Sequence, residues 1–260
     1  MKKLTSIAVL LLSATVLSSC GEEAFPDITG PLAESRIKFF NFSVGAPGVY
    51  FYANSSKAAG IGAVSIVIDA RKGVVTSSAE SVTGTTYGNV TAGGYYSAIA
   101  PGSYDLQAKL ADTTQRATVV SKVTTSIAGG KHYSYYQSGA YDAVTKTADA
   151  FVLEDNFPAN FDWTQAYVRF VNAGPTSAPL TLYGTNTSTA TPEAAIGAIT
   201  AYKGGSAFVG VPTGSYTLAA KDAGGVSKVT RTAVSFLAGR VYTITLRGTT
   251  SLFLDNTTNR

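Results

Sequence analysis

The side chains that most often carry out catalysis are scarce in this sequence. The 260 residues include one histidine, His132, and one cysteine, Cys20. Hydrolytic enzymes usually place a general base such as histidine beside a serine or cysteine nucleophile. Tyr133 and Tyr135 are expected to face the core from a strand, so that His132 points outward. No nucleophile-elbow, zincin or phosphate-loop motif occurs. We therefore expect no catalytic residue and no enzymatic activity.

Side chains that bind metals or nucleic acids are also few. One histidine and one cysteine nearly exclude a zinc or copper site. Glu154, Asp155 and Asn156, with Asp149, are the densest group of oxygen ligands for calcium, but they more simply cap a strand. The basic residues form no cluster, so nucleic acid is not an expected partner. We expect neither a metal nor a cofactor.

Aromatic residues offer a different chemistry, the stacking of sugar rings. The chain has 15 tyrosines and one tryptophan, and tyrosine in a strand is first of all a packing residue. Outward-facing Tyr136 and Tyr141, together with Trp163, could form a ligand surface. For Trp163, packing between two modules is the simpler expectation. Thr113, in Asp112-Thr113-Thr114, resembles a short O-glycosylation acceptor motif of bacterial exported proteins.

The N-terminus has the pattern of an export signal. Lys2-Lys3 precede an apolar run from Ile7 to Leu17, which is too short to span a bilayer. Leu17-Ser18-Ser19-Cys20 then resembles a bacterial lipobox. That resemblance implies cleavage after residue 19 and lipidation of Cys20, whereas an incidental cysteine after an ordinary signal peptide is the alternative. Residues 20–35 lack periodicity and are expected to form a flexible tether. We expect a lipid-anchored protein of the cell envelope, on the periplasmic or surface-exposed face of the outer membrane.

Beyond the tether the sequence repeats itself. Ile99–Lys109 recurs as Val211–Lys221, with six of eleven positions identical. Each copy has a Pro/Gly turn, then Ser-Tyr, then alternating polarity, which predicts a half-buried strand. Further pairs align at both ends of the repeat. They include Lys38-Phe39-Phe40-Asn41 with Arg169-Phe170-Val171-Asn172, and Asp155-Asn156 with Asp255-Asn256.

These repeats predict an all-β protein of two tandem antiparallel β-sandwich modules, of immunoglobulin or transthyretin-like type. We expect the first module at 36–156, a linker at 157–166 and the second module at 167–260. Each module should contain about seven short strands. The first module carries extra residues near 57–84, where an added hairpin is expected.

Three motifs of the second module match a known family. They are Arg169-Phe170-Val171-Asn172-Ala173, Val211-Pro212-Thr213-Gly214-Ser215-Tyr216, and Tyr242-Thr243. In these the chain resembles domain-of-unknown-function family 4397, found in bacterial exported proteins and lipoproteins. The first module departs from the pattern at Phe42 and Ala100, so its assignment depends more on the internal repeat. The resemblance implies an extracytoplasmic β-sandwich and no established activity.

Two hypotheses for function follow. The first is a non-enzymatic, lipid-anchored envelope protein whose modules act as a scaffold or a protein-interaction surface. The second is a carbohydrate-binding accessory lipoprotein on the cell surface. The expected partners are the membrane, through the lipid, and envelope proteins or glycans.

Overall fold

The computed structural model describes residues 34–260, except 60–61, 70–72, 81–82, 113 and 176–177. This part of the chain is built from strands, with a single 3₁₀ turn, η1 (Thr91–Gly94). The predicted all-β class is therefore confirmed. No helix within the described residues is long and apolar enough to cross a membrane.

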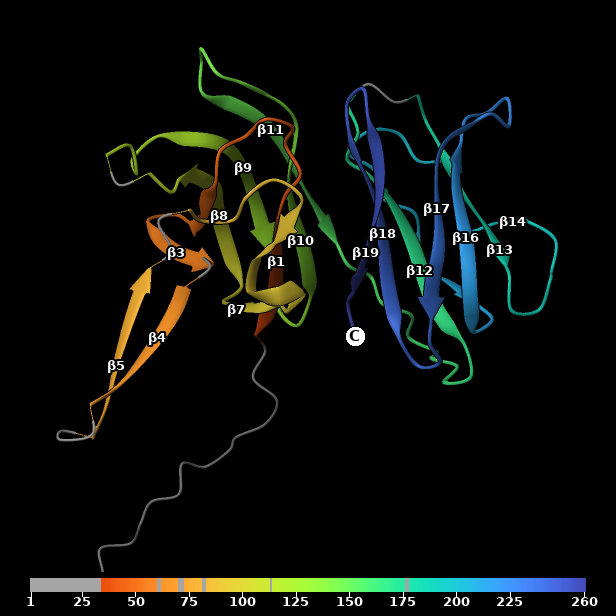
Figure 1. Ribbon diagram of the computed structural model, residues 1–260, viewed down its shortest axis with the longest axis horizontal. Helices are drawn as coiled ribbons and strands as arrows, with labels where there is room; N and C mark the ends of the chain where they lie inside the picture. Colours follow the sequence, from red (N-terminus) through yellow and green to blue (C-terminus); the bar gives the residue numbers. More distant parts are fainter. Residues whose placement is uncertain (1–33, 60–61, 70–72, 81–82, 113, 176–177) are drawn as a thin grey trace, which may run out of the picture. The chain divides into compact units, whose positions relative to one another are not determined.

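The first module consists of two sheets (Figure 1). One sheet has the order β11-β10-β1-β6, with β7 also paired to β1, and the other has the order β3-β2-β8-β9. Their bounds are β1 (Ser35–Asn41), β2 (Val49–Ala53), β3 (Ser56–Ala59), β6 (Asn89–Val90), β7 (Ser97–Ile99), β8 (Gly102–Leu110), β9 (Val119–Ile127), β10 (His132–Asp142) and β11 (Thr147–Glu154).

A separate two-stranded hairpin occupies the segment where the sequence predicts an insertion. Its strands are β4 (Gly62–Asp69) and β5 (Gly73–Glu80). They pair antiparallel from Gly62 opposite Glu80 to Asp69 opposite Gly73.

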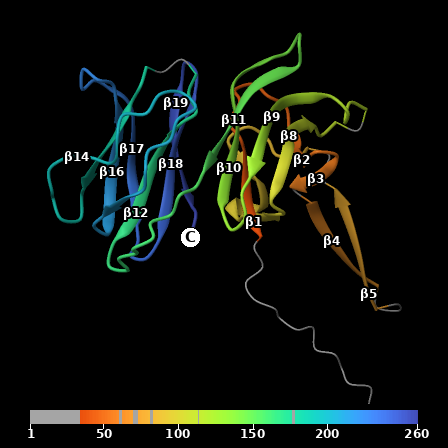
Figure 2. The same ribbon diagram turned by 180° about the vertical axis from the view of Figure 1, so that it is seen from behind.

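The second module repeats the two-sheet plan (Figure 2). Its sheets have the orders β15-β12-β18-β19 and β14-β13-β16-β17. The bounds are β12 (Ala166–Asn172), β13 (Thr181–Asn186), β14 (Ala194–Ala195), β15 (Val209–Val211), β16 (Gly214–Lys221), β17 (Ser227–Phe236), β18 (Val241–Gly248) and β19 (Leu252–Thr258).

Each module buries its own core between its two sheets. In the first module, Phe39 of β1 stacks on Phe51 of β2, with ring centroids 5.0 Å apart. In the second, Phe170 of β12 and Leu218 of β16 belong to one buried cluster. Because the two faces of each sandwich contribute to one core, the sheets are held together by burial of apolar surface.

One strand pair in each module is parallel, which differs from the predicted antiparallel sandwich. β1 pairs with β10 in parallel, and β12 pairs with β18 in the same way. Parallel neighbours need a long crossover, which here passes through the second sheet of the module. Strand polarity of this kind depends on long-range topology and leaves no local pattern in the sequence.

The repeated Pro/Gly turns have equivalent structures. Gly102 and Gly214 open β8 and β16 with φ angles of +153° and +146°, which favour glycine. Two residues later, the Tyr104 hydroxyl donates to the Ala100 carbonyl at 2.9 Å. The Tyr216 hydroxyl donates to the Pro212 carbonyl at 2.7 Å. The tyrosine thus closes the turn that precedes its own strand.

The last strands of the two modules, β11 and β19, are equivalent in a different register from the one predicted from the sequence. The hydroxyls of Tyr133 and Tyr242 each accept a backbone N–H five residues upstream, at 3.0 and 3.1 Å, so these tyrosines are equivalent. Tyr133 pairs with Glu154, and Tyr242 pairs with Thr258. Asp155 is therefore equivalent to Asn259, and its predicted alignment with Asp255 is wrong by four residues.

Candidate functional site at the junction of the two modules

The strand β1 has a face that its own core does not cover. Phe39 points into the core, while its neighbour Phe40 belongs to another buried cluster together with Tyr136. Phe40 stacks on Tyr136 with centroids 4.6 Å apart. Val171 and Ala173 of the second module join the same cluster. The outer faces of β1 and β12 are thus buried against each other, within one compact unit that spans Ala33–Arg260.

Tyr136 therefore does not form an outward ligand surface, and that prediction is wrong. Its side chain is fully buried, and burial raises its pKa to about 12. The alternation of the strand does point Tyr136 away from its own core. The second module, rather than solvent, occupies that side.

A buried ion pair crosses the junction from the second module to the first. Arg169 of β12 pairs with Asp155, which directly follows β11, and both side chains are buried. Asp155 also accepts hydrogen bonds from Tyr96 at 2.6 Å and from Ser134 at 2.7 Å. The Arg169 guanidinium also donates to Thr243 at 3.0 Å. The burial cost of the two charges is offset by this set of partners.

A reciprocal contact crosses the junction from the first module to the second. Lys38, the equivalent of Arg169, donates to the Thr258 carbonyl at 2.9 Å and to Asn259 Oδ1 at 3.2 Å. Asn259 is the equivalent of Asp155, as shown above. Burial lowers the pKa of Lys38 to about 8, against the opposing charge of Asp155. The contact is therefore two-fold in character, with each module offering equivalent positions to the other.

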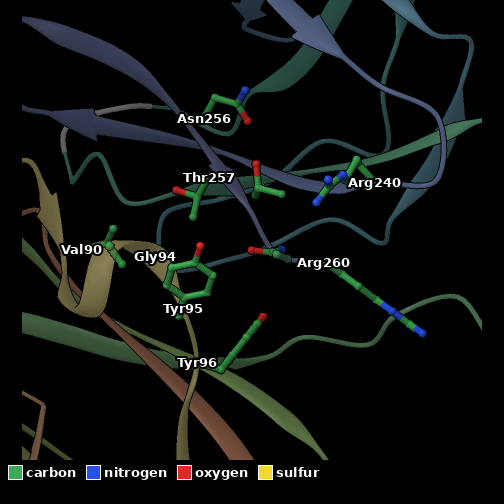
Figure 3. Close-up of a pocket in the computed structure, with 11 residues that line it drawn as sticks. Val90, Gly94, Tyr95, Tyr96, Arg240, Asn256, Thr257 and Arg260 are labelled. Carbon is green, nitrogen blue, oxygen red and sulfur yellow. The ribbon is translucent and has the colours of Figure 1, made fainter.

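The reciprocal arrangement leaves two equivalent openings beside the junction. The larger has a volume of about 600 Å³. Figure 3 shows Tyr95 and Tyr96 on one side of it, with Asn256, Thr257 and Arg240 opposite. It is lined by Val90, Gly93, Gly94, Tyr95, Tyr96, Arg240, Asn256, Thr257, Thr258, Asn259 and Arg260.

A neighbouring hollow of about 500 Å³ shares Tyr95, Tyr96, Asn259 and Arg260 with this opening. It adds Arg36, His132 and Phe157. We call the two hollows together the junction groove.

The second opening is the counterpart of the first and is smaller, about 260 Å³. It is lined by Leu153, Glu154, Asn156, Arg169, Gly205, Ser206, Ala207 and Phe208. The β7 and β15 registers make Phe208 equivalent to Tyr96 and Ala207 equivalent to Tyr95. Both aromatic rings cover a cation: Tyr96 lies 4.2 Å from Lys38 Nζ, and Phe208 lies 4.8 Å from the Arg169 guanidinium.

His132 lies in the junction groove and is half-buried rather than fully outward. The centroid of its ring lies 5.0 Å from the ring centroids of both Tyr96 and Phe157. Burial lowers its pKa, Asp155 opposes this, and Arg36, Arg260 and Lys38 lower it further. Burial and these three cations thus favour the neutral form of the imidazole.

Trp163 is not packed into the junction, so that prediction is wrong. It is 66% exposed and makes a T-shaped contact with Phe161, with ring centroids 4.8 Å apart. Asp162 accepts from the Thr164 backbone and hydroxyl in a tight turn, which places Trp163 at the tip. Phe157 is the linker aromatic that packs at the junction, against Tyr96 and Phe208.

The remaining predicted residues lie elsewhere. Tyr141 is partly buried against the first core and lines a separate pocket of about 660 Å³ with Lys146 and Gln115. Cys20 and Thr113 fall outside the described residues. Asp149 pairs with Lys203. In the described part of the chain, no three His, Cys, Asp or Glu side chains converge in a metal-binding arrangement.

Lys38, Arg169 and Tyr96 were not predicted as functional residues from the sequence. One available signal was a basic residue at the same place in two aligned strands, Lys38 in Ile37-Lys38-Phe39-Phe40 and Arg169 in Val168-Arg169-Phe170-Val171, with apolar residues on both sides. A lone cation amid buried positions needs a partner, and here that partner comes from the other module.

Similarity to known proteins identifies the family of this chain. The model of a domain of unknown function, DUF4397, matches residues 35–183 and, in a second match, 166–259. No curated protein matches the chain. Among solved structures, the Bacillus anthracis TIE protein is similar at 12% identity and a TM-score of 0.25, over 83% of this chain and 34% of that chain. This protein thus spans about a third of that structure's length. The chain belongs to the DUF4397 family and carries two tandem copies of its domain.

Proposed function

We propose that this protein is a non-enzymatic, lipid-anchored component of the cell envelope whose two modules act together as one scaffold. The observation that carries the proposal is the junction. A tandem pair joined by a flexible linker alone would leave Phe40 and Val171 exposed, whereas both are fully buried. The buried pair of Arg169 and Asp155 fixes which faces meet.

NMR relaxation of the backbone amides tests whether the modules form one body. We expect amides of both modules to report one rotational correlation time. Two distinct correlation times in the parent protein would contradict a shared scaffold.

The lipid anchor is the second part of the proposal, and it depends on the sequence around Cys20. Metabolic labelling with radioactive palmitate should label the parent protein and leave Cys20→Ala unlabelled. Ser19→Ala is the matched control, because it keeps a small residue before the cysteine and should still be labelled. An unlabelled parent protein would exclude the anchor.

Carbohydrate binding is a second candidate function, favoured by the junction groove. Its exposed Tyr95, half-buried Tyr96 and polar Asn256 combine an aromatic surface with hydrogen-bonding groups. Sugar-binding pockets need both kinds of group. An array of envelope and plant glycans tests this function, and an absence of binding to every glycan would contradict it.

A further inference from the structure

We propose that the junction groove binds an acidic saccharide, with the sugar ring on Tyr95 and its carboxylate on the arginines of the groove. This inference rests on the carbohydrate-binding candidate and specifies its ligand. The site combines residues from both modules: Tyr95 and Tyr96 come from the first, and Arg240 and Arg260 come from the second.

Tyr95 is the aromatic surface of the site. It is 78% exposed and lines the larger opening next to Tyr96 (Figure 3). Its neighbour Tyr96 is held in place because its hydroxyl donates to Asp155 at 2.6 Å. The pair thus provides one fixed ring and one ring open to a ligand.

Three arginines line the groove, Arg36, Arg240 and Arg260, and the Arg260 guanidinium lies 5.7 Å from the centre of the Phe161 ring at its border. Asp155, which accepts a hydrogen bond from Tyr96 of the groove, is buried and already paired with Arg169. Burial lowers the pKa of His132 and Asp155 opposes this, while Arg36 and Arg260 lower it further. Guanidinium groups bind carboxylates with two parallel hydrogen bonds, which favours an anionic ligand over a neutral one.

A hydrogen-bond acceptor in the groove lacks a partner. Asn256 Oδ1 is buried and makes no hydrogen bond, although its side chain lines the larger opening. Buried acceptors are nearly always satisfied in folded proteins. A hydroxyl group of a bound sugar would supply the missing donor after a small side-chain adjustment.

The second opening shows that the fold does not require an exposed aromatic ring or a set of arginines beside the junction. It has Ala207 where the groove has Tyr95, and Asn156 where the groove has Arg260. Lys131, the equivalent of Arg240, is paired with Glu154. The junction closes on both sides, yet only one side has an exposed ring and a set of arginines. The stability of the junction therefore does not account for them, and a ligand-binding role fits their presence on one side.

The volume of the larger opening, about 600 Å³, lies within the usual range for small-ligand sites. We expect one to three sugar rings to be held, and no corresponding site at the smaller opening.

Calorimetric titration of the full-length protein in detergent tests the proposal. The probes are trisaccharides of galacturonate, glucuronate, mannuronate and guluronate, each compared with its methyl ester. The ester keeps the ring and removes the charge. We expect at least one acid to bind, and its ester to bind about tenfold or more weakly because the charge-assisted hydrogen bonds are lost.

Two groove variants and one control locate the site. Tyr95→Ala and Arg240→Gln should each weaken binding about tenfold. Lys131→Gln makes a similar charge change at the equivalent position and should leave the affinity unchanged. Tyr95 is exposed, so Tyr95→Ala should keep the parental melting temperature.

Each other outcome overturns a different statement. Equal binding of acid and ester would overturn the acidic specificity and leave carbohydrate binding intact. Equal weakening by Lys131→Gln would place the interaction outside the groove. If no acid binds while neutral glycans bind on the array, this inference fails alone. If neither binds, the carbohydrate-binding candidate fails with it.

Discussion

At the residue scale, the junction depends on a few polar side chains buried between apolar faces. Arg169 and Asp155 are each surrounded by hydrogen-bond partners from both modules. Such a pair adds little net stability compared with apolar residues of the same size. Removing one member is costly, however, because the other charge stays buried without its partner.

Asp155→Asn should lower the free energy of unfolding by about 3–5 kcal/mol. Asp255→Asn is the matched control, since Asp255 pairs with Arg247 at a partly exposed site, and it should cost about 1 kcal/mol or less. Urea denaturation of both variants gives the two values. Equal costs would mean that the Arg169 pair is not buried at the junction.

The burial of Lys38 gives the protein a pH-dependent stability. Its pKa is lowered to about 8 in the folded state, so between pH 8 and its normal pKa the unfolded chain binds more protons than the folded one. Stability should therefore rise from pH 8 to pH 10, by on the order of 2 kcal/mol. Above pH 10 the trend should reverse, because burial raises the pKa values of Tyr135 and Tyr136 and the unfolded chain loses these protons first.

Denaturation at several pH values measures this profile. Lys38→Met should flatten the rise between pH 8 and 10. Lys122→Met, at an exposed lysine, should retain it. A parent protein whose stability falls over this range would contradict the assignment to Lys38.

At the element scale, the repeated turns before β8 and β16 have the same backbone and different surroundings. A Cβ on Gly102 would meet only the Tyr104 ring, at 3.7 Å, whereas a Cβ on Gly214 would lie 2.6 Å from Asn186 Oδ1. Both glycines have positive φ, so alanine strains either turn.

We expect Gly102→Ala to cost about 1 kcal/mol and Gly214→Ala about 2–3 kcal/mol in unfolding free energy. Thermal melting of the two variants provides the comparison. If Gly102→Ala instead cost as much as Gly214→Ala or more, this expectation would be wrong, and the Asn186 side chain would have to move aside freely.

These turns were also what the sequence predicted best. Pro/Gly chemistry and period-two alternation depend on neighbouring residues, so they identify Tyr104 and Tyr216 as equivalent without any structure. Alternation also places Tyr133 and Tyr135 correctly in the first core. It does not say what covers the second face, and for this reason Tyr136 was wrongly expected in solvent.

Two other errors have the same origin. The short motif Asp-Asn occurs near the C-terminal end of each module and suggested an alignment of Asp155 with Asp255. Strand register, however, is set by the whole hydrogen-bonded ladder. The junction groove combines η1 and its flanking residues with the last strand of the other module. No local pattern predicts such a meeting of distant segments, so the sequence alone does not predict the groove.

At the scale of the whole molecule, duplication supplied two similar faces that now cover each other. Similar faces pack in a two-fold manner, which creates paired features: Lys38 with Arg169, Tyr96 with Phe208, and one opening with the other. Sequence divergence between the copies then gave the two openings different chemistry. A shared apolar interface of this kind should also couple the unfolding of the two modules.

Calorimetry should accordingly show one cooperative unfolding transition for the parent protein. Val171 is buried among Phe40, Tyr136 and Phe151 of the first module, so Val171→Asp places an unpaired charge in the junction. We expect this variant to melt roughly 6–12 °C lower, for a loss of about 3 kcal/mol, and to split into two transitions because each module keeps its own core. Ser235→Asp, at an exposed position of β17, should leave the single transition in place. Two resolved transitions in the parent protein would show that the modules fold independently, and the coupling argued from their shared face would then be wrong.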